Sequence, residues 1–370
     1  MNIEKDLKKD GITVIKQLDT LSVTLIAKYV AEKLISALPF YGLNYSNLFI
    51  KICNIPMFIA NIPNNMGEAS YFYKNSSIYF RDGLSIHEMK RYAVHEFIHA
   101  YQEVKDKNNI LYRLGLCDFT GVKIHGMALN EAAVQLISAK ALNNDIETVK
   151  YYDIEFTTNT PSLYPIICNL VNQLSYITGE NVLFDSTLNS NSKFVKSLIS
   201  LCGEKNFYKI NANLDKILKI EEKMISLSNK LENEFVSDTF IARASTKIGL
   251  YKNTIKNIFF ETQNLIITSY FNKALNNVYS LQEIEDYRKK LYYYRDLLGT
   301  TKNYTFFNDY YINMMIKLDE KYEAVSNIEL ALVPYTRSIF EIIIQKIRAL
   351  IINKRTRGKL SKSKITFVLI

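Results

Sequence analysis

The sequence predicts an α+β protein in which a domain with a small β-sheet precedes a mainly α-helical C-terminal domain. Apolar residues alternate along short stretches between residues 45 and 80, a pattern that is typical of strands. From about residue 212 onward they recur almost continuously at helical spacing. The apolar content of 48% and the charged content of 22% are those of a folded globular chain. We therefore expect domains at 1–211 and 212–350 and a basic tail at 351–370.

Two elements are predicted before the first cluster of turn residues. Residues 13–38 carry an apolar stripe at helical spacing, so they predict a helix that ends at Pro39. Residues 45–62 change to a period of two, which predicts a strand. Pro56 interrupts this strand, and we expect it to resume over Phe58–Ile62.

A turn and a hairpin are predicted next. Residues 63–67 combine proline, asparagine and glycine, and therefore indicate a turn. Ala69–Tyr73 and Ser77–Phe80 are short β-prone runs separated by three polar residues, as in a hairpin. Asp82-Gly83 then turns the chain again.

Residues 86–105 predict the helix that carries the candidate site. Ser85 and Glu88 fit a capping box at its start. The helix contains His95-Glu96-x-x-His99, and residues i and i+4 lie on one helix face. The two imidazoles can therefore each give one nitrogen to a tetrahedral Zn²⁺ ion. Glu96 projects to one side of this pair, where it could deprotonate a metal-activated water.

Another side of the same helix is apolar. Val94, Phe97, Ile98 and Tyr101 follow the i, i+3, i+4, i+7 rule, and their stripe is centred away from the two histidines. We expect this stripe to be buried in a core while the histidines face a site. His87 lies near the helix start and is rotated off the histidine face, so we interpret it as structural.

Two histidines leave a zinc site in need of a third protein ligand. A third histidine on the same segment is absent, because Gln102 and Lys105 occupy the relevant positions. Glu131 is the preferred candidate and His125, on a glycine-flanked loop, is the alternative. Glu131 begins a polar stripe on a helix predicted at 127–143 that is otherwise apolar almost all round. The stripe continues through Gln135 and Ser138.

The rest of the chain is predicted to consist of loops and helices. Residues 108–126 are expected to form a loop or short helix, and residues 144–160 a polar loop. The helices are expected at 161–178, 192–202, 210–225, 215–236, 238–276, 281–298, 303–326 and 328–353. The helical C-terminal half contains no cluster of catalytic residue types, which favours a packing or partner-binding role for it.

The two central motifs resemble those of a known enzyme group. His95-Glu96-x-x-His99 followed by Asn130-Glu131-Ala132-Ala133 resembles the gluzincin group of zinc metallopeptidases, including uncharacterised bacterial members, over residues 65–180. The resemblance implies a zincin-like catalytic domain with His95, His99 and Glu131 as ligands of one zinc ion per chain. It also implies that Glu96 is the general base. Gln135 stands where that group often has an acid that binds a ligand histidine. An amide oxygen there can still accept the imidazole N–H, but it raises ligand basicity less.

The predicted reaction is peptide-bond hydrolysis by a metal-activated water, with Glu96 moving the proton to the leaving amine. The transition state also needs a hydrogen-bond donor, for which His125, Tyr152 and Tyr164 are the candidates. The strand Ser77–Phe80 is either the sheet edge that binds an extended peptide or an ordinary hairpin arm. The alternative function is a catalytically inactive, metalloprotease-like binding or regulatory protein.

The charge distribution bears on other partners. Six basic residues in 351–370, with no acid among them, supply most of the formal net charge of +9. Such a tail could touch a membrane surface, or it could be a solvated chain end; we do not expect nucleic acid as a partner. The expected partner is a peptide or protein substrate, and the oligomeric state is left open. The four cysteines are far apart in sequence, and no signal peptide or transmembrane run is evident, so the expected location is cytoplasmic.

Overall fold

The computed structural model describes residues 3–9, 11–63, 67–108, 110–119, 125–233, 237–298, 305–331 and 347–348. Its internal contacts divide the chain into two compact units, Met1–Ile266 and Ile267–Ile370. The expected α+β class, with small sheets and a helical C-terminal region, is confirmed. The first unit continues past residue 211, where the sequence places a domain boundary. The basic tail at 351–370 lies outside the described residues.

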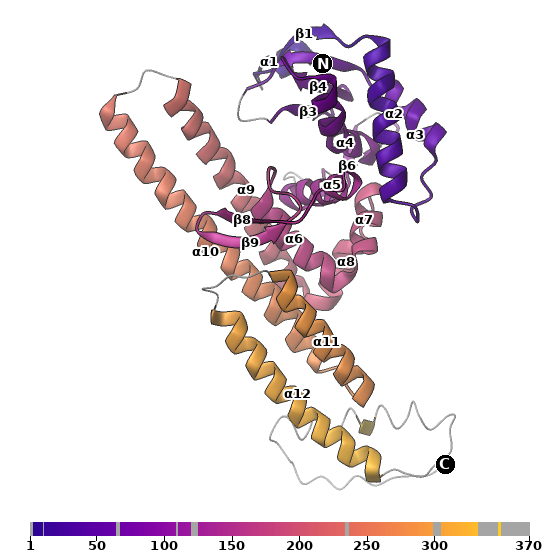
Figure 1. The fold of residues 1–370 in the computed structure, drawn as a ribbon, viewed down its shortest axis with the longest axis vertical. Helices are drawn as coiled ribbons and strands as arrows, with labels where there is room; N and C mark the ends of the chain where they lie inside the picture. Colours follow the sequence, from indigo (N-terminus) through magenta and orange to yellow (C-terminus); the bar gives the residue numbers. More distant parts are fainter. Residues whose placement is uncertain are drawn as a thin grey trace. The chain divides into compact units, whose positions relative to one another are not determined.

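The described strands form three small sheets (Figure 1). The first has the order β1-β2-β4-β3, the second the order β5-β6-β7, and the third is the β8–β9 hairpin. Their bounds are β1 Thr13–Gln17, β2 Met57–Asn61, β3 Ala69–Phe72, β4 Ser77–Arg81, β5 Glu103–Lys105, β6 Leu111–Leu114, β7 Cys117–Asp118, β8 Glu147–Tyr151 and β9 Ile154–Thr158.

The other regular elements among the described residues are helices. Their bounds are α1 Ile3–Lys9, α2 Thr20–Ala37, α3 Tyr45–Cys53, α4 Ile86–Gln102, α5 Met127–Ala141, α6 Pro165–Thr178, α7 Glu180–Leu188, α8 Lys193–Cys202, α9 Glu204–Asn233, α10 Asp238–Leu275, α11 Leu281–Leu298 and α12 Thr305–Ala331. Among them, none combines the length and the apolar character needed to cross a bilayer.

The first two elements differ from the sequence prediction. Residues 13–17 form β1 rather than the start of a helix, because they pair with β2, and α2 begins later, where Asp19 accepts a hydrogen bond from the backbone of Ser22. The predicted strand from residue 45 is helix α3. Leu48 and Ile52 are buried at i and i+4, while Ile50 between them is 57% exposed. Leu48 and Ile52 therefore mark the apolar face of a helix, and Ile50 completed the apparent alternation from the exposed side. The predicted continuation over residues 58–62 is confirmed as β2.

The predicted hairpin and the start of the site helix are confirmed. β3 and β4 pair antiparallel, and Ser85 and Glu88 form the capping box of α4. The strand Ser77–Phe80 is not a sheet edge, since β4 lies between β2 and β3. β3 is one of the two edge strands of this sheet, and α4 packs against it. Of the predicted turn 63–67, residues 64–66 lie outside the described residues.

Several segments predicted as helix or loop form strands. Residues 103–105 leave the predicted helix and pair with β6, so α4 ends at Gln102. The predicted loop 108–126 contains β6 and β7, and the predicted polar loop 144–160 contains the β8–β9 hairpin. Both pairs are antiparallel. β6 and β7 are very short, and β8 and β9 are mostly polar, so neither pair gives a clear alternation in the sequence.

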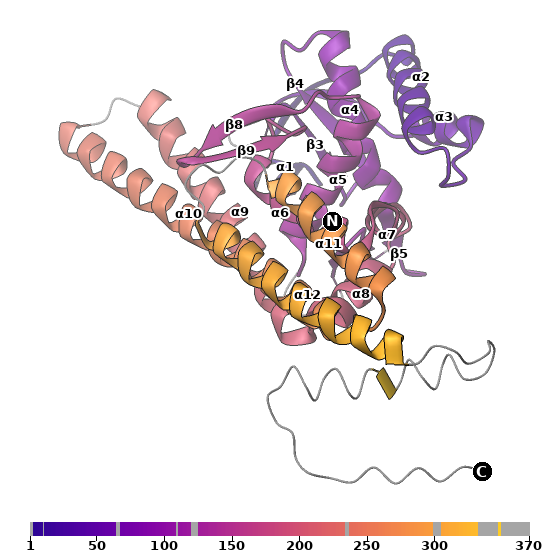
Figure 2. The ribbon, with the colours of Figure 1, turned by 60° about the horizontal axis from the view of Figure 1, so that its bottom comes forward.

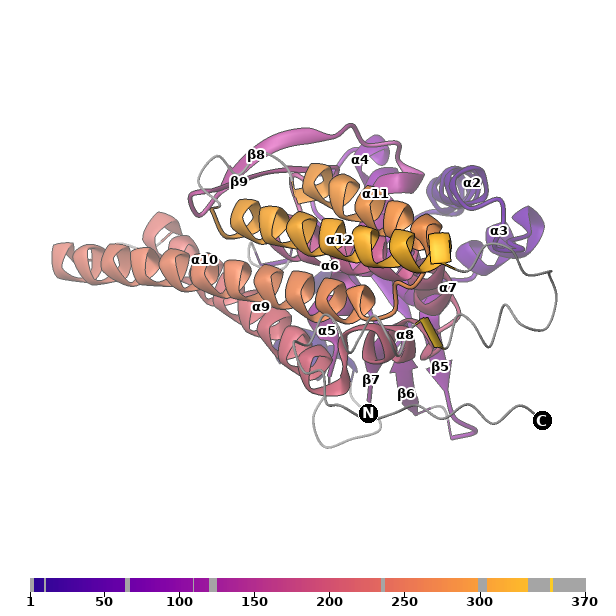
Figure 3. The ribbon, with the colours of Figure 1, turned by 90° about the horizontal axis from the view of Figure 1, so that it is seen from below.

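The later helices follow the prediction with shifted bounds. α6 begins at Pro165 rather than Pro161, α7 was not expected, and α9 is one helix where two overlapping helices were predicted. The predicted helix 328–353 lies mostly outside the described residues. In the second unit, α11 and α12 lie side by side (Figure 3).

Candidate metal centre

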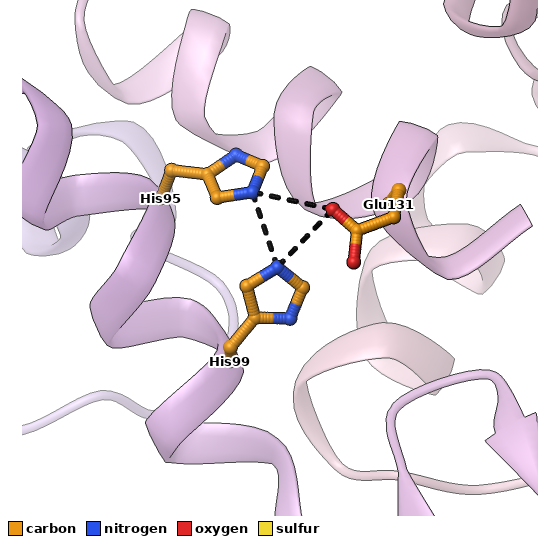
Figure 4. A group of neighbouring side chains, drawn as sticks. All are labelled: His95, His99 and Glu131. Atoms are coloured by element: carbon orange, nitrogen blue, oxygen red, sulfur yellow. Dashed lines mark hydrogen bonds and ion pairs between the residues drawn. The ribbon is translucent and has the colours of Figure 1, made fainter. Parts of the chain in front are cut away.

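Two neighbouring helices of the first unit carry the candidate ligands. α4 and α5 contact each other and appear close together in Figure 2. His95 and His99 project from α4 toward Glu131 on α5, as Figure 4 shows. The histidines are 8% and 6% exposed. The predicted burial of α5 is confirmed, since most of its residues are buried on every side.

The three ligand atoms form a nearly equilateral triangle. The Nε2 atoms of His95 and His99 are 3.1 Å apart. The Oε2 atom of Glu131 lies 3.6 Å from the first nitrogen and 3.5 Å from the second. A tetrahedral zinc ion about 2.0–2.1 Å from its ligands separates them by about 3.3 Å. The spacing therefore fits such an ion, and these three residues could hold a metal.

The remaining nitrogen of His95 is fixed by α5. The Oε1 atom of Gln135 lies 2.9 Å from His95 Nδ1, so the amide oxygen can accept the N–H of the ring. This contact places the lone pair of Nε2 in the triangle, which is the tautomer that a metal requires. The Nδ1 atom of His99 is buried and has no hydrogen-bond partner in the part of the chain that the structure describes.

Glu96 lies beside the triangle and is held by the edge strand. Its Oε2 atom accepts a hydrogen bond of 2.6 Å from the backbone N–H of Tyr71 on β3. Arg81 donates its backbone N–H to the carbonyl of Glu68, so these two residues form a hydrogen-bonded pair of the β3–β4 ladder. Hydrogen-bonded and non-hydrogen-bonded pairs alternate along an antiparallel ladder, so the backbone N–H of Tyr71 points away from β4. The contact with Glu96 agrees with that direction. Sequence reasoning missed this contact because a backbone donor has no residue signature.

The close approach of acceptors perturbs their acid–base behaviour. Burial lowers the pKa of His95, but the hydrogen bond to Glu131 and the charges of Glu96 and Glu131 outweigh it, so the net shift is upward. Burial raises the pKa of Glu131, but His99 and His95 together hold it well below its ordinary value. Three atoms with lone pairs thus converge, and a positive charge among them is strongly favoured.

The three candidate hydrogen-bond donors are in different places. Burial raises the pKa of Tyr164 well above its ordinary value, and the charges of Glu131 and Glu96 raise it further, so its hydroxyl lies in the field of the site and stays protonated. The hydroxyl of Tyr152 instead donates to Glu221 on α9 at 3.2 Å. His125 is exposed, and its backbone carbonyl accepts from Asp118. His125 is not part of the ligand triangle.

The remaining residues singled out from the sequence are not among the three candidate ligands. Ser138, the last residue of the polar stripe, is buried in α5, and His87 is exposed at the start of α4. Sequence reasoning also missed Glu221, a buried carboxyl group on α9. Burial raises its pKa to about 7, although the hydrogen bond from Tyr152 opposes the shift. The available signal in the sequence was a glutamate on the apolar face of an amphipathic helix.

Comparison with family models, with curated proteins and with solved structures finds no match for this chain.

Proposed function

We propose that the protein is a zinc-dependent peptidase. The observation that carries the proposal is the triangle formed by His95, His99 and Glu131, because its edges suit tetrahedral zinc and leave a fourth position open. The order of the motifs, with Glu96 inside the first and Glu131 in a second helix, supports a gluzincin-type site in a zincin-like domain. When bound, the metal would polarise the scissile carbonyl and activate a water.

The residues around the triangle have distinct roles in this proposal. Glu96 takes the proton of the attacking water and delivers it to the nitrogen of the leaving amine as the C–N bond breaks. The amide of Tyr71 orients the carboxylate of Glu96. The protonated hydroxyl of Tyr164 donates to the developing oxyanion, for which its raised pKa suits it.

The edge strand provides a place for an extended substrate. β3 ends the four-stranded sheet next to α4, and the backbone at Tyr71 is directed away from β4 toward Glu96. A peptide that pairs with this strand would bring its backbone close to the general base. We therefore assign the peptide-binding role to β3 rather than to residues 77–80, for which the sequence analysis left it open.

Metal content tests the ligand set. Purified wild type is compared with His95→Ala and Glu131→Gln, and with His87→Ala and His125→Ala as matched controls, by elemental analysis. We expect about one zinc per chain in the wild type and both controls, and loss in the two ligand variants. A wild type that takes up no zinc after reconstitution would contradict the proposal. Loss in His125→Ala with retention in Glu131→Gln would transfer the third ligand to His125.

A peptide-library screen tests the reaction. Glu96→Gln keeps the shape of the side chain but cannot accept a proton, so we expect it to retain zinc and to lose about 10²–10⁴-fold in hydrolysis. Glu147→Gln, an exposed glutamate on β8, is the control and should retain full activity. Undiminished hydrolysis in Glu96→Gln would exclude the mechanism.

The second candidate is a metal-binding regulatory protein without turnover. The contact of His95 with Gln135 favours it, because an amide makes the ligand less basic than a carboxylate would. Full zinc occupancy with no cleavage of any library peptide would support this candidate over the peptidase.

A further inference from the structure

A pair of buried amides joins the two ligand helices close to the metal centre. The Nδ2 atom of Asn130 on α5 lies 3.4 Å from the Oε1 atom of Gln102 on α4 and donates to it. Each side chain is 1% exposed. Asn130 immediately precedes Glu131, and Gln102 follows His99 by one helical turn. The pair therefore connects the backbones that carry two of the three ligands.

Further hydrogen bonds extend this pair to two more segments. The Oδ1 atom of Asn130 accepts from the backbone N–H of Leu116, at 3.0 Å. Ser190, between α7 and α8, donates its hydroxyl to the backbone carbonyl of Gln102 and accepts from the N–H of Gly115 at 2.8 Å. The end of α4, the turn between β6 and β7, the start of α5 and the α7–α8 loop thus meet at one buried point.

The packing at this point leaves no room for a side chain at position 115. Gly115 has a φ of +56°, and a Cβ atom there would lie 2.2 Å from Asn130 Oδ1 and 2.5 Å from Gln102 Nε2. Glycine tolerates both the positive φ and the close approach. The backbone thus packs directly onto both amides, so their positions are closely constrained.

Stability alone is a weak reason for burying two amides between helices. A neutral hydrogen bond contributes about 0.5–1.5 kcal/mol net, whereas two apolar side chains of similar shape would be nearly neutral or stabilising there. What amides add is direction, because the two hydrogen bonds of the Asn130 side chain form in one helix arrangement and break in others. A metal site needs that constraint, since its ligands must be held to within about 0.5 Å.

We propose that Asn130 and Gln102 are positioning residues for the metal centre. They fix α4 against α5 so that Glu131 Oε2 stands at coordinating distance from the two histidine nitrogens. The inference rests on the proposed function, since it concerns the zinc that the triangle would bind. Ser190 and Gly115 support the pair from outside α4 and α5.

Zinc affinity and the cobalt spectrum test this role. The variants are Asn130→Leu, which removes both hydrogen bonds, and Ser190→Ala, which removes the support for Gln102. Competition with a chromogenic chelator should show about 10–100-fold weaker zinc binding in Asn130→Leu and a smaller loss in Ser190→Ala. The d–d absorption of bound Co²⁺ should change in both.

A buried amide on another helix is the matched control. Gln173 on α6 is 0% exposed and donates to Asn169 at 2.8 Å. Gln173→Leu should also lower the melting temperature, yet leave zinc affinity within about twofold and the Co²⁺ spectrum unchanged. If Asn130→Leu does not fold, the zinc affinity and the Co²⁺ spectrum of Ser190→Ala test the positioning role.

Two results would overturn the inference in distinguishable ways. Wild-type zinc affinity and an unchanged Co²⁺ spectrum in both variants would refute the positioning role while leaving the metal centre intact. A wild type that binds neither zinc nor cobalt would remove the proposed function and the positioning role together.

Discussion

Buried polar groups occur both at the α4–α5 contact in the first unit and beside α12 in the second, but their chemistry differs. At α4–α5, two histidine nitrogens and a carboxylate oxygen point at one another across 3.1–3.6 Å. In the second unit, the ammonium group of Lys321 on α12 is buried, and it donates to the carbonyl oxygens of Leu275 at 2.5 Å and Val278 at 2.9 Å. Acceptors face acceptors in the first case, and a donor meets acceptors in the second.

The difference separates a candidate functional site from a structural contact. Lys321 donates to two carbonyl groups near the C-terminal end of α10, so this donor already meets acceptors within the fold. The triangle on α4 and α5 is complete only with a proton or a cation in it. A ligand should therefore change the stability of the first unit much more than that of the second.

Zinc should produce the largest effect. At free zinc about 1,000-fold above its dissociation constant, the free energy of unfolding should rise by about 4 kcal/mol. Urea denaturation with and without a chelator measures this rise, which Glu131→Gln should abolish. Because the pKa of His95 is raised, protons should compete with the metal for this side chain. The zinc-dependent increase in the free energy of unfolding should therefore become smaller as the pH falls and His95 is protonated. An equal rise in Glu131→Gln would show that zinc stabilises the chain elsewhere.

Replacing Lys321 tests the other half of the comparison. Lys321→Met keeps the length of the side chain but leaves the two carbonyl groups without this donor, which should cost about 1–3 kcal/mol in the free energy of unfolding. Zinc affinity should remain unchanged, because the triangle is intact. Calorimetry and chelator competition on the same sample measure both quantities. A large loss of zinc affinity in Lys321→Met would contradict the division of roles.

Glu221 should give an effect that is smaller than that of zinc and depends on pH. Burial raises its pKa from 4.5 to about 7, so ionisation above that pH opposes folding. The stabilising influence of its protonated form is full below about pH 4.5 and is lost as the pH rises through about 7. Glu221→Gln still accepts from Tyr152 and should be more stable than wild type by about 3 kcal/mol at pH 8, but not at pH 4. Thermal melts across pH test this; a pH-independent difference would refute the assignment to Glu221.

The local chemistry of the site could be predicted from the sequence, since it depends on spacing along single helices. His95 and His99 share a face through the i, i+4 relation, and the capping box at Ser85 marks where α4 begins. Glu131 could be selected because a carboxylate on an almost wholly buried helix requires a partner. Distances between α4 and α5, and the choice of Tyr164 over Tyr152, depend on tertiary packing and could not be predicted.

Errors in the fold arose where one pattern suited two structures. α3 alternates like a strand over a few residues, and only its packing on α2 reveals the i, i+4 face. The β8–β9 hairpin turns at Tyr152 and Asp153, which have φ values of +53° and +60°. Two positive φ values are typical of a two-residue hairpin turn, but asparagine and glycine usually signal it. Tyrosine and aspartate gave no such signal.

The candidate ligands His99 and Glu131 come from the two ends of a long chain segment. His99 and Glu131 enclose the end of α4 and all of the β5–β7 sheet. An ion shared between them would close this segment into a loop, as a covalent cross-link does, and so reduce the conformational entropy of the unfolded chain. Metal binding should then slow the exchange of amide hydrogens in the β5–β7 sheet, although none of its strands carries a candidate ligand.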